Sequence, residues 1–318
     1  MPAAPTMRAV VQDRPGGPDV LRIADVPRPA PLPTEILVRV HAAGVNPADW
    51  KTRERGVFPT GERPPFTPGW DVSGVVEEVG AGVTLFRPGD EVFGMPRFPH
   101  PAGAYAEYVT APARHFAPRP APLDHVRAAA VPLVGLTAWQ ALVDTADVRP
   151  GQRVLVHAAA GGVGHVAVQI AKARGAHVLG TARAAKHAYL RSLGADELID
   201  YTTEDVAAAG PVDVVLDALG GDSWTRSLAL LRPGGTLVSL LPPGPGWPAD
   251  AAREAGVRAV FVLVEPDPIG LRELASLIEK GALTVRVDAT FPLAEAAAAH
   301  ALGAAGRTTG KIVLTLPG

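Results

Sequence analysis

Apolar and polar residues alternate over short segments in the first third of the chain. Residues 35–42 carry apolar side chains at positions 36, 38 and 40, which is the period of a half-buried strand. Turns rich in proline and glycine, such as Pro15–Pro18 and Arg87–Asp90, separate the segments. Further strands are predicted over residues 7–12, 20–26, 72–79, 91–95 and 104–110. Short strands between dense turn signals predict an all-β first half.

Two helical stretches interrupt this pattern. One or two helical turns are predicted over residues 47–55, because Asn46 is a residue type that favours a helix N-cap. Residues 123–144 predict helices, with Asp124 as a cap and a second run over 137–143, and a domain boundary near this point.

From Gly151 onward, strands and helices alternate. Strands are predicted over residues 154–157, 177–181, 197–199, 212–217, 236–241 and 258–264. Helices are predicted between them over residues 164–174, 184–193, 223–230 and 249–255. Such alternation indicates a parallel, doubly wound sheet with helices on both faces. A helix over 270–280, a strand over 284–291, a helix over 293–302 and a strand over 312–316 complete the chain.

The turn at the start of this alternating region carries the clearest motif. After the apolar run 154–156, Ala159, Gly161 and Gly164 stand at the spacing of a dinucleotide fingerprint, with alanine in the first glycine position. Small residues are needed there because a pyrophosphate must approach the backbone and the free N–H groups at a helix N-terminus. The strand, loop, helix and second strand in that order predict a nucleotide site; the alternative is a tight turn without a nucleotide.

Composition excludes several classes of protein. The 318 residues suggest two domains, and 47% of them are hydrophobic. A net charge of −2 argues against a nucleic-acid surface, and no apolar run is long enough to span a bilayer. The absence of cysteine excludes disulfides and thiolate metal sites. Residues 1–6 show no secretion signal, and we expect a cytoplasmic protein.

Several motifs together resemble a known family. The residues that match the signature of the quinone oxidoreductase and zeta-crystallin family are Gly151–Gln152, Leu155, Ala159–Gly162, Gly164, Gln169 and Lys172. The segments 44–49, 68–71, 135–139 and 310–313 are also similar to that family. The resemblance implies a zinc-independent medium-chain dehydrogenase/reductase. It implies a GroES-like catalytic domain made of residues 1–128 and 266–318, and a Rossmann NADP-binding domain over residues 129–265.

The resemblance also bears on zinc. Zinc-dependent relatives place a cysteine near Asn46, a His–Glu pair at Trp70–Asp71 and a third ligand near Val134. Asn46, Trp70 and Val134 are poor zinc ligands, so no metal is expected. Without a Lewis acid, hydrogen bonds alone must polarise a carbonyl, which favours an acceptor that is already conjugated.

The residues after the second strand predict the cofactor. NAD-binding proteins usually carry an acidic residue about 20 positions past the first fingerprint glycine. Here the segment 180–187 has no acid but contains Arg183 and Lys186, which would pair with a 2′-phosphate. The family's Lys and Tyr in this region resemble Lys186 and Tyr201. We therefore expect NADPH; the alternative is a solvated basic turn at the start of a helix.

The other cofactor contacts are implied by the family's motifs. The full set is Asn46, Val134, Thr137, Ala159, Gly161, Gly162, Val163, Thr181, Arg183, Lys186, His187, Tyr201, Ala218, Leu219, Leu240, Val262, Val264 and Lys311. Thr137 is expected near the nicotinamide face, and Lys311 either reaches the phosphate or closes the cleft. The apolar members of the set are equally explained as core residues.

Candidate catalytic residues are Asn46, Asp49 and Tyr105. Asn46 would hold the nicotinamide ribose or a substrate oxygen. Tyr105, or alternatively Tyr108, would donate a proton. The alternative for Asp49 is a helix cap, and strand alternation equally explains Tyr105 as a buried residue. Aromatic side chains that would line a flat substrate slot are Trp50, Phe58, Phe66 and Trp70, unless they are simply core. No residue is established as the proton donor.

These observations predict an NADPH-dependent, zinc-free reductase of quinones or α,β-unsaturated carbonyls. One alternative is an enoyl-thioester reductase, since related domains have that role in polyketide synthesis. A second alternative is a cofactor-binding structural or RNA-associated protein, against which the low net charge argues. The superfamily often forms dimers through edge strands, which indicates a homodimer through residues 258–264.

Overall fold

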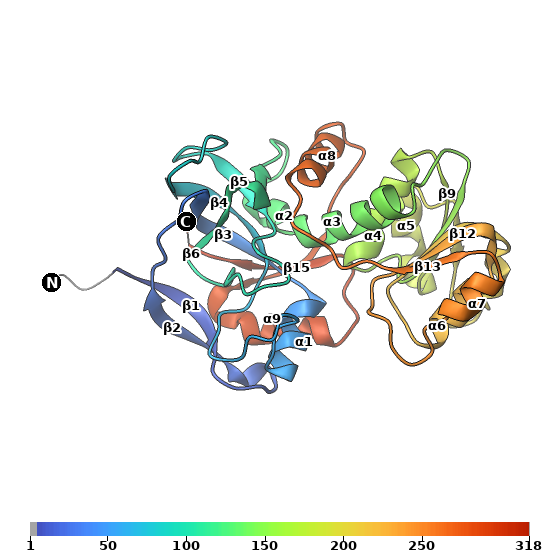
Figure 1. Cartoon of the computed structure of the whole chain (residues 1–318), viewed down its shortest axis with the longest axis horizontal. Coiled ribbons are helices and arrows are strands. Elements are labelled where there is room, and N and C mark those ends of the chain that lie inside the picture. The colour runs from blue at the N-terminus through green and yellow to red at the C-terminus, as the bar shows by residue number, and fades with distance from the viewer. Residues whose placement is uncertain (1–4, 318) are drawn as a thin grey trace. The chain divides into compact units, whose positions relative to one another are not determined.

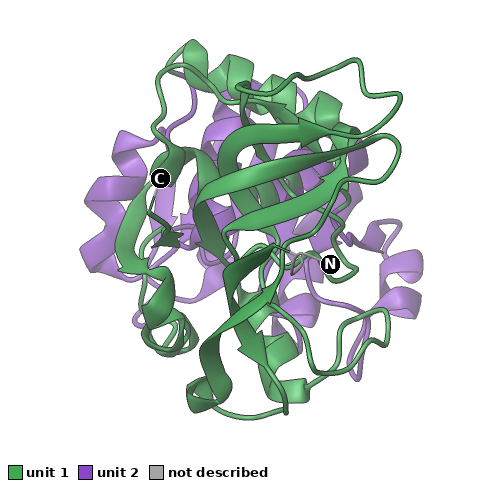
Figure 2. Cartoon of the chain, turned by 90° about the vertical axis from the view of Figure 1, so that its left-hand side faces the viewer, with its two compact units in different colours: residues 1–136, 265–281, 285–318 green, residues 137–264, 282–284 purple. Residues whose placement is uncertain are grey.

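The computed structural model describes residues 5–317; residues 1–4, in which no secretion signal is expected, and residue 318 lie outside the described part. The chain divides into two compact units (Figure 2). Unit 1 comprises residues 1–136, 265–281 and 285–318, and unit 2 comprises residues 137–264 and 282–284. The sequence placed the first boundary at residue 129; the division after Leu136 falls inside a helix. Thr284 groups with unit 2 through Gln169, whose Oε1 accepts its backbone N–H at 2.9 Å.

Unit 1 is built on sheets that are antiparallel except for the parallel pair β14 (Val287–Pro292) and β15 (Lys311–Thr315). Strands β1 (Thr6–Gln12) and β2 (Leu21–Pro27) pair with each other. The larger sheet runs in the order β14, β15, β3 (Glu35–Val45), β4 (Asp71–Val79), β5 (Glu91–Gly94) and β7 (Phe116–Pro118), and β6 (Tyr108–Pro112) also pairs with β3. Figure 1 labels β1 to β6 and β15 of this unit.

Strand β3 is more buried than its alternation predicted. Ile36, Val38 and Val40 lie in the main core of unit 1, as expected for one face. On the opposite face, Leu37 and Ala42 are also buried, and Ala42 packs in a separate cluster with residues of the helical segment 129–130. The prediction of a half-buried strand was therefore wrong, because both faces of β3 are covered.

The predicted strand over 104–110 is only partly regular. Strand β6 begins at Tyr108, and the preceding residues make isolated backbone bonds instead. Tyr105 donates its N–H to the carbonyl of Pro68 at 3.0 Å and accepts from the N–H of Val10 at 2.9 Å. These bonds tie three separate segments of unit 1 together and bury Tyr105 completely.

Two helices of unit 1, α1 (Pro47–Arg55) and α2 (His125–Ala129), begin at the predicted caps Asn46 and Asp124. Further helices of this unit are α3 (Pro132–Trp139, continuing into unit 2), α8 (Pro268–Glu279) and α9 (Ala296–Ala304). Asp124 accepts the N–H of Arg127 at 2.8 Å, which confirms it as the cap of α2. Residues 137–143 are helical as predicted, but the helix is longer than expected, because α3 starts at Pro132 and then widens into a π-helical turn over Gln140–Thr145.

Unit 2 is a parallel sheet in the order β10-β9-β8-β11-β12-β13. The strands are β8 (Arg153–Val156), β9 (His177–Thr181), β10 (Glu197–Ile199), β11 (Val212–Asp217), β12 (Leu231–Ser239) and β13 (Arg258–Phe261). The helices are α4 (Gly162–Ala173), α5 (His187–Ser192), α6 (Asp222–Leu228) and α7 (Ala249–Glu254). Figure 1 shows α4 and α5 on one side of the sheet and α6 and α7 on the other. The predicted α/β fold class, a GroES-like β-rich domain plus a doubly wound parallel sheet, is confirmed.

The order of strands places a switch point in this sheet. Strand β8 pairs with β9 on one side and with β11 on the other, so the chain leaves β8 in opposite directions to build the two halves. Ligands of open α/β sheets bind at the carboxyl ends of the strands at such a point.

Strand β13 ends at Phe261, so the predicted strand over 258–264 is shorter than expected.

No helix within residues 5–317 combines the length and the apolar character that crossing a membrane requires.

Candidate functional site

The carboxyl edge of the unit 2 sheet gathers most of the residues predicted to bind a cofactor. Because the strands are parallel, the segments that follow β8, β9, β10, β11, β12 and β13 all emerge at this edge. The residues placed there are Ala159, Gly161, Gly162, Val163, Thr181, Arg183, Lys186, His187, Tyr201, Ala218, Leu219, Leu240, Val262 and Val264. The structure thus brings them to one edge, and their contact with a cofactor stays a prediction.

The turn after β8 is too tight for larger residues. A Cβ atom on Gly164 would lie 2.4 Å from the carbonyl oxygen of Ala158 and 2.7 Å from the Cα of Ala159. Helix α4 begins at Gly162, so the N–H groups of its first turn point out of the edge. This close-packed turn at a helix N-terminus is the geometry that a pyrophosphate requires.

The segment after β9 presents positive charge. Arg183 is exposed, and its Nε donates to the hydroxyl of Tyr201 at 3.1 Å, while Lys186 is half-buried. The nearby carboxylate of Asp200 accepts hydrogen bonds from the backbone N–H groups of Ala184 and Thr202, both at 3.0 Å. Asp200 thus holds the loop that carries Arg183 and Lys186 through bonds to its backbone.

The segments after β11, β12 and β13 are fixed by backbone bonds. Asp217 Oδ1 accepts the N–H groups of Leu219 at 2.7 Å and Gly220 at 2.8 Å. Leu240 donates its N–H to the carbonyl of Asp217 at 2.8 Å, and Val262 donates to Ser239 at 3.0 Å. The ends of neighbouring strands are therefore held in register at the edge.

Sequence reasoning missed a buried polar group at the same edge. His157, which follows β8, contacts Thr181 and also Ser227 of α6, a residue 70 positions away. Since no local pattern links residues so far apart, only the packing of α6 on the sheet shows this contact.

In unit 1, Asn46, Asp71 and Lys311 form a buried cluster. Asn46 Nδ2 donates to Asp71 Oδ2 at 2.8 Å, and the Lys311 ammonium donates to Asn46 Oδ1, to the carbonyl of Val45 at 3.0 Å and to Asp71 Oδ2 at 3.2 Å. Burial raises the pKa of Asp71, and the charge of Lys311 opposes the rise. Lys311 is only 3% exposed, and these three acceptors lie within unit 1.

Asp49 and Tyr105 belong to a second buried group. Asp49 Oδ2 accepts the backbone N–H of Asn46 at 2.6 Å, as the capping alternative predicted. Burial raises the pKa of Asp49 to about 7. Burial, and after it the charge of Asp49, raises the pKa of Tyr105 well above its usual range. A carboxyl group that titrates near neutral pH is suited to holding or releasing a proton.

His300 and Arg53 complete this group, and neither was predicted. Arg53 Nη1 lies 3.1 Å from His300 Nδ1, and His300 Nε2 lies 3.3 Å from the hydroxyl of Tyr105. Because a guanidinium only donates, His300 carries its proton on Nε2. Burial lowers the pKa of His300 to about 3, so it remains neutral.

The predicted aromatic slot divides into two parts. Phe58 contacts Phe66 and Trp70, with ring centroids 4.4 Å and 5.4 Å apart, and both Phe58 and Trp70 are buried. Trp50 makes its ring contact with His300 instead. Phe58 and Trp70 are therefore core residues, which is the alternative that the sequence left open for part of this set. Val134 and Thr137 are both buried on α3.

Comparisons with known proteins identify the family. A family model described as an alcohol dehydrogenase GroES-like domain matches residues 32–121, and one described as a zinc-binding dehydrogenase matches residues 193–314. The quinone oxidoreductase of Pseudomonas aeruginosa is 38% identical over 94% of this chain and 96% of its own length. The chain belongs to the quinone oxidoreductase family of medium-chain dehydrogenases and reductases. The resemblance in the sequence motifs is thus confirmed, and this family member is an oxidoreductase of the pyridine-nucleotide type.

Solved structures agree with this membership. The quinone oxidoreductase of Coxiella burnetii is 37% identical with a TM-score of 0.90, covering 98% of this chain and 100% of its own. A mycobacterial protein solved in complex with NADPH is 34% identical with a TM-score of 0.86, at the same coverage.

Some relatives are much longer than this chain. The spectinabilin polyketide synthase system protein NorB of Streptomyces orinoci is 40% identical over 94% of the chain. The chain spans 14% of the length of that relative.

The description of the second family model names zinc, and the residues of this chain do not fit it. The chain has no cysteine, and residues 5–317 contain no group of three or more His, Asp or Glu side chains that could hold a metal ion. Between Asn46 and Asp71, the ammonium of Lys311 already supplies the positive charge.

Proposed function

We propose that this oxidoreductase is an NADPH-dependent reductase that transfers hydride to a quinone or to an α,β-unsaturated carbonyl. The observation that carries the cofactor assignment is the pair Arg183 and Lys186 after β9, beside a carboxylate, Asp200, whose oxygens accept backbone N–H groups. These two cations would pair with the 2′-phosphate, and the segment 180–187 itself carries no carboxylate that would repel it. The NADPH complex of a 34% identical relative supports the same assignment.

The chain's own residues have distinct roles in this proposal. Bound NADPH would supply the hydride. The turn over residues 158–164 holds the pyrophosphate on the first N–H groups of α4. Arg183, Lys186 and Tyr201 bind the 2′-phosphate side, and the backbone after β11, β12 and β13 orients the nicotinamide side.

Hydrogen bonds must polarise the acceptor, since the donor set does not fit zinc. The candidate donors are Asn46 and Tyr105, and Asp49, whose pKa burial raises to about 7, is the candidate for holding the proton that completes the reduction. All three are buried and bonded within unit 1, so acting on the acceptor would require them to exchange these partners. A conjugated acceptor delocalises the charge left by hydride addition, so a quinone or an enone is a suitable substrate. Quinone reduction by relatives that carry that name supports this acceptor class.

Steady-state kinetics with NADPH and NADH test the cofactor assignment. Arg183→Glu is expected to raise the KM for NADPH roughly 30-fold or more and to leave the KM for NADH nearly unchanged, since NADH has no 2′-phosphate. Arg191→Glu, an equal charge change on the exposed last turn of α5, is the matched control and should alter neither constant. Equal losses for both nucleotides in the Arg183 variant would refute the assignment.

A second candidate function is reduction of an enoyl thioester. The 40% identity to a polyketide synthase protein favours it. Turnover of NADPH with a quinone, an enone and an enoyl thioester distinguishes the two functions by the acceptor with the highest kcat/KM. No oxidation with any acceptor would favour a non-enzymatic, cofactor-binding role.

We also propose a homodimer through β13. This strand pairs with β12 through Thr236–Arg258 and the following residues and lies last in the described sheet. An edge strand exposes unpaired backbone groups that a second copy can satisfy. Light scattering in solution should give twice the mass of the chain, and a monomer would refute this arrangement.

A further inference from the structure

His157 lies at the centre of a buried hydrogen-bonded chain at the carboxyl edge of the unit 2 sheet. Its Nδ1 is 3.2 Å from the hydroxyl of Thr181 at the end of β9, and its Nε2 is 3.0 Å from the hydroxyl of Ser227 on α6. Ser227 in turn lies 3.4 Å from Asp217 Oδ2 at the end of β11. The side chains of this chain are at most 5% exposed.

The direction of each bond follows from the donors available. Asp217 Oδ1 accepts two backbone N–H groups, and as a carboxylate the residue only accepts, so Ser227 donates its proton to Oδ2. The Ser227 oxygen then accepts from Nε2–H of His157. The unprotonated Nδ1 accepts the hydroxyl proton of Thr181, whose oxygen accepts the N–H of Ala158 at 3.2 Å. The neutral Nε2–H tautomer satisfies every bond.

This chain joins the three segments to which the cofactor is assigned. Ala158 belongs to the fingerprint turn, Thr181 precedes the basic segment 182–187, and Asp217 holds the N–H groups of the segment 218–220. Ala158 has a φ of 49°, a left-handed conformation that is strained for a residue with a side chain. Neighbouring bonds must therefore hold this turn in place.

We propose that His157 is a positioning residue that couples the 2′-phosphate side of the NADPH site to its nicotinamide side by fixing these three segments. The inference rests on the proposed function. His157 contacts no cofactor itself, and it acts through Thr181 and through Asp217.

The environment of His157 disfavours its charged form. Burial lowers its pKa; of the charged groups that face it, Asp217 on β11 opposes the shift and Arg226 on α6 adds to it. A proton on Nδ1 would remove the acceptor that Thr181 needs, so the chain of bonds is intact only with the neutral ring.

Fluorescence titration of NADPH with the full-length protein tests the role. His157→Phe keeps the ring shape but breaks both bonds, and we expect the Kd for NADPH to rise about tenfold or more. Ser227→Ala should raise the Kd by a similar factor. The Kd of the double variant should not exceed the higher of the two single-variant values, because the residues act through one chain of bonds. Additive losses would contradict the coupling.

A conservative variant separates positioning from stability. His157→Asn retains an acceptor for Thr181 while losing the bond to Ser227, so its Kd should lie between those of the wild type and His157→Phe; if the Phe variant does not fold, the Asn variant decides. His177→Gln, at the opposite edge of the sheet, is the matched control and should bind NADPH as the wild type does. Wild-type Kd values in both His157 variants would overturn the inference, whereas failure of the wild type itself to bind NADPH would overturn the proposed function.

Discussion

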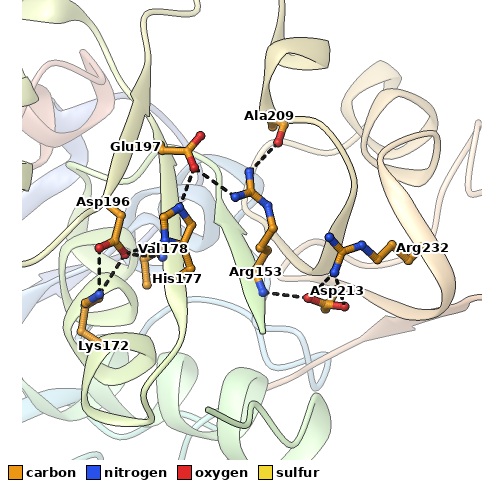
Figure 3. Close-up of polar contacts among 9 residues, drawn as sticks. All are labelled: Arg153, Lys172, His177, Val178, Asp196, Glu197, Ala209, Asp213 and Arg232. Atoms are coloured by element: carbon orange, nitrogen blue, oxygen red, sulfur yellow. Dashed lines mark hydrogen bonds and ion pairs between the residues drawn. The ribbon is translucent and has the colours of Figure 1, made fainter. Parts of the chain in front are cut away.

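The two edges of the unit 2 sheet use polar residues in opposite ways. At the amino edge, partly exposed charges form contacts over the starts of the strands β8 to β12 (Figure 3). Arg153 of β8 donates to Glu197 of β10 at 3.0 Å, and Lys172 of α4 donates to Asp196 at 2.8 Å. At the carboxyl edge, the polar chain around His157 is buried. Charges that remain in water contribute little stability individually, whereas buried polar groups are costly unless every bond is made.

The two histidines at these edges illustrate the difference. His177, with a side chain 40% exposed, bonds Glu197 Oε1 at 2.5 Å and faces solvent. His157 is 5% exposed and lies between two hydroxyl groups. We therefore expect substitutions at the amino edge to change stability by a small amount and to leave cofactor binding unchanged. Substitutions at the carboxyl edge should change cofactor binding. The following predictions test this division.

The largest effect is expected at the fingerprint turn. In Gly164→Ala, the new methyl group meets backbone atoms of Ala158 and Ala159, which cannot move without opening the turn. We expect a destabilisation of about 1–3 kcal/mol and a Kd for NADPH raised at least about tenfold. Urea unfolding and fluorescence titration measure the two quantities. Gly244→Ala, where a Cβ meets nothing within 4 Å, is the control. A wild-type Kd for NADPH in Gly164→Ala would contradict this prediction, because it would show that the turn accepts a Cβ atom.

Acid should affect the carboxyl edge first. Since burial lowers the folded-state pKa of His157 below 6.5, its contribution to stability is lost as the pH falls below 6.5, by up to about 1.4 kcal/mol per pH unit. At the amino edge, burial raises the pKa of Asp196, but the bonds from Lys172 and Val178 outweigh it, and the bond from His177 lowers that of Glu197. Both carboxylates thus lose their contribution only as the pH falls below their ordinary values of 3.8 and 4.5.

Urea unfolding at pH 7.5, 5.5 and 4 measures this order. The difference in stability between the wild type and His157→Asn should shrink between pH 7.5 and 5.5, while the difference between the wild type and Asp196→Asn should stay constant over that interval. The reverse order would place the acid-sensitive group at the amino edge.

At the amino edge, Asp196→Asn should lower stability without changing the cofactor site. Its carboxylate accepts from Lys172 and from the N–H of Val178, but the Lys172 and Asp196 side chains are about one-third exposed, so we expect a loss of about 0.5–1 kcal/mol. The loss should decrease in 1 M NaCl, and the Kd for NADPH should remain within about twofold of the wild-type value. A tenfold weaker affinity would mean that both edges control binding.

The smallest effect is expected for His177→Gln. The side chain is 40% exposed and its partner Glu197 also accepts from Arg153, so the change in stability should be below about 0.5 kcal/mol. Thermal unfolding at pH 7.5 measures it. A shift as large as that of His157→Asn would remove the contrast between the two edges.

Much of unit 2 was predictable because its signals are local. The spacing of Ala159, Gly161 and Gly164 and the alternation of strands and helices predicted a parallel sheet, and parallel strands necessarily bring their carboxyl ends to one edge. Unit 1 was less predictable. The alternation of β3 predicted one buried face, but the helical segment near Ala129 covers the other, and that packing depends on residues far away in the sequence.

The sequence by itself determined the family, the two kinds of sheet and the edge at which the cofactor residues collect, because these follow from periodicity and short spacings. Only the tertiary structure decided which polar side chains meet inside. Arg53 and His300 are 247 positions apart, and His157 and Ser227 are 70 apart, yet each pair is in contact. A buried polar group must find its partner wherever packing places one, and no local pattern records that choice.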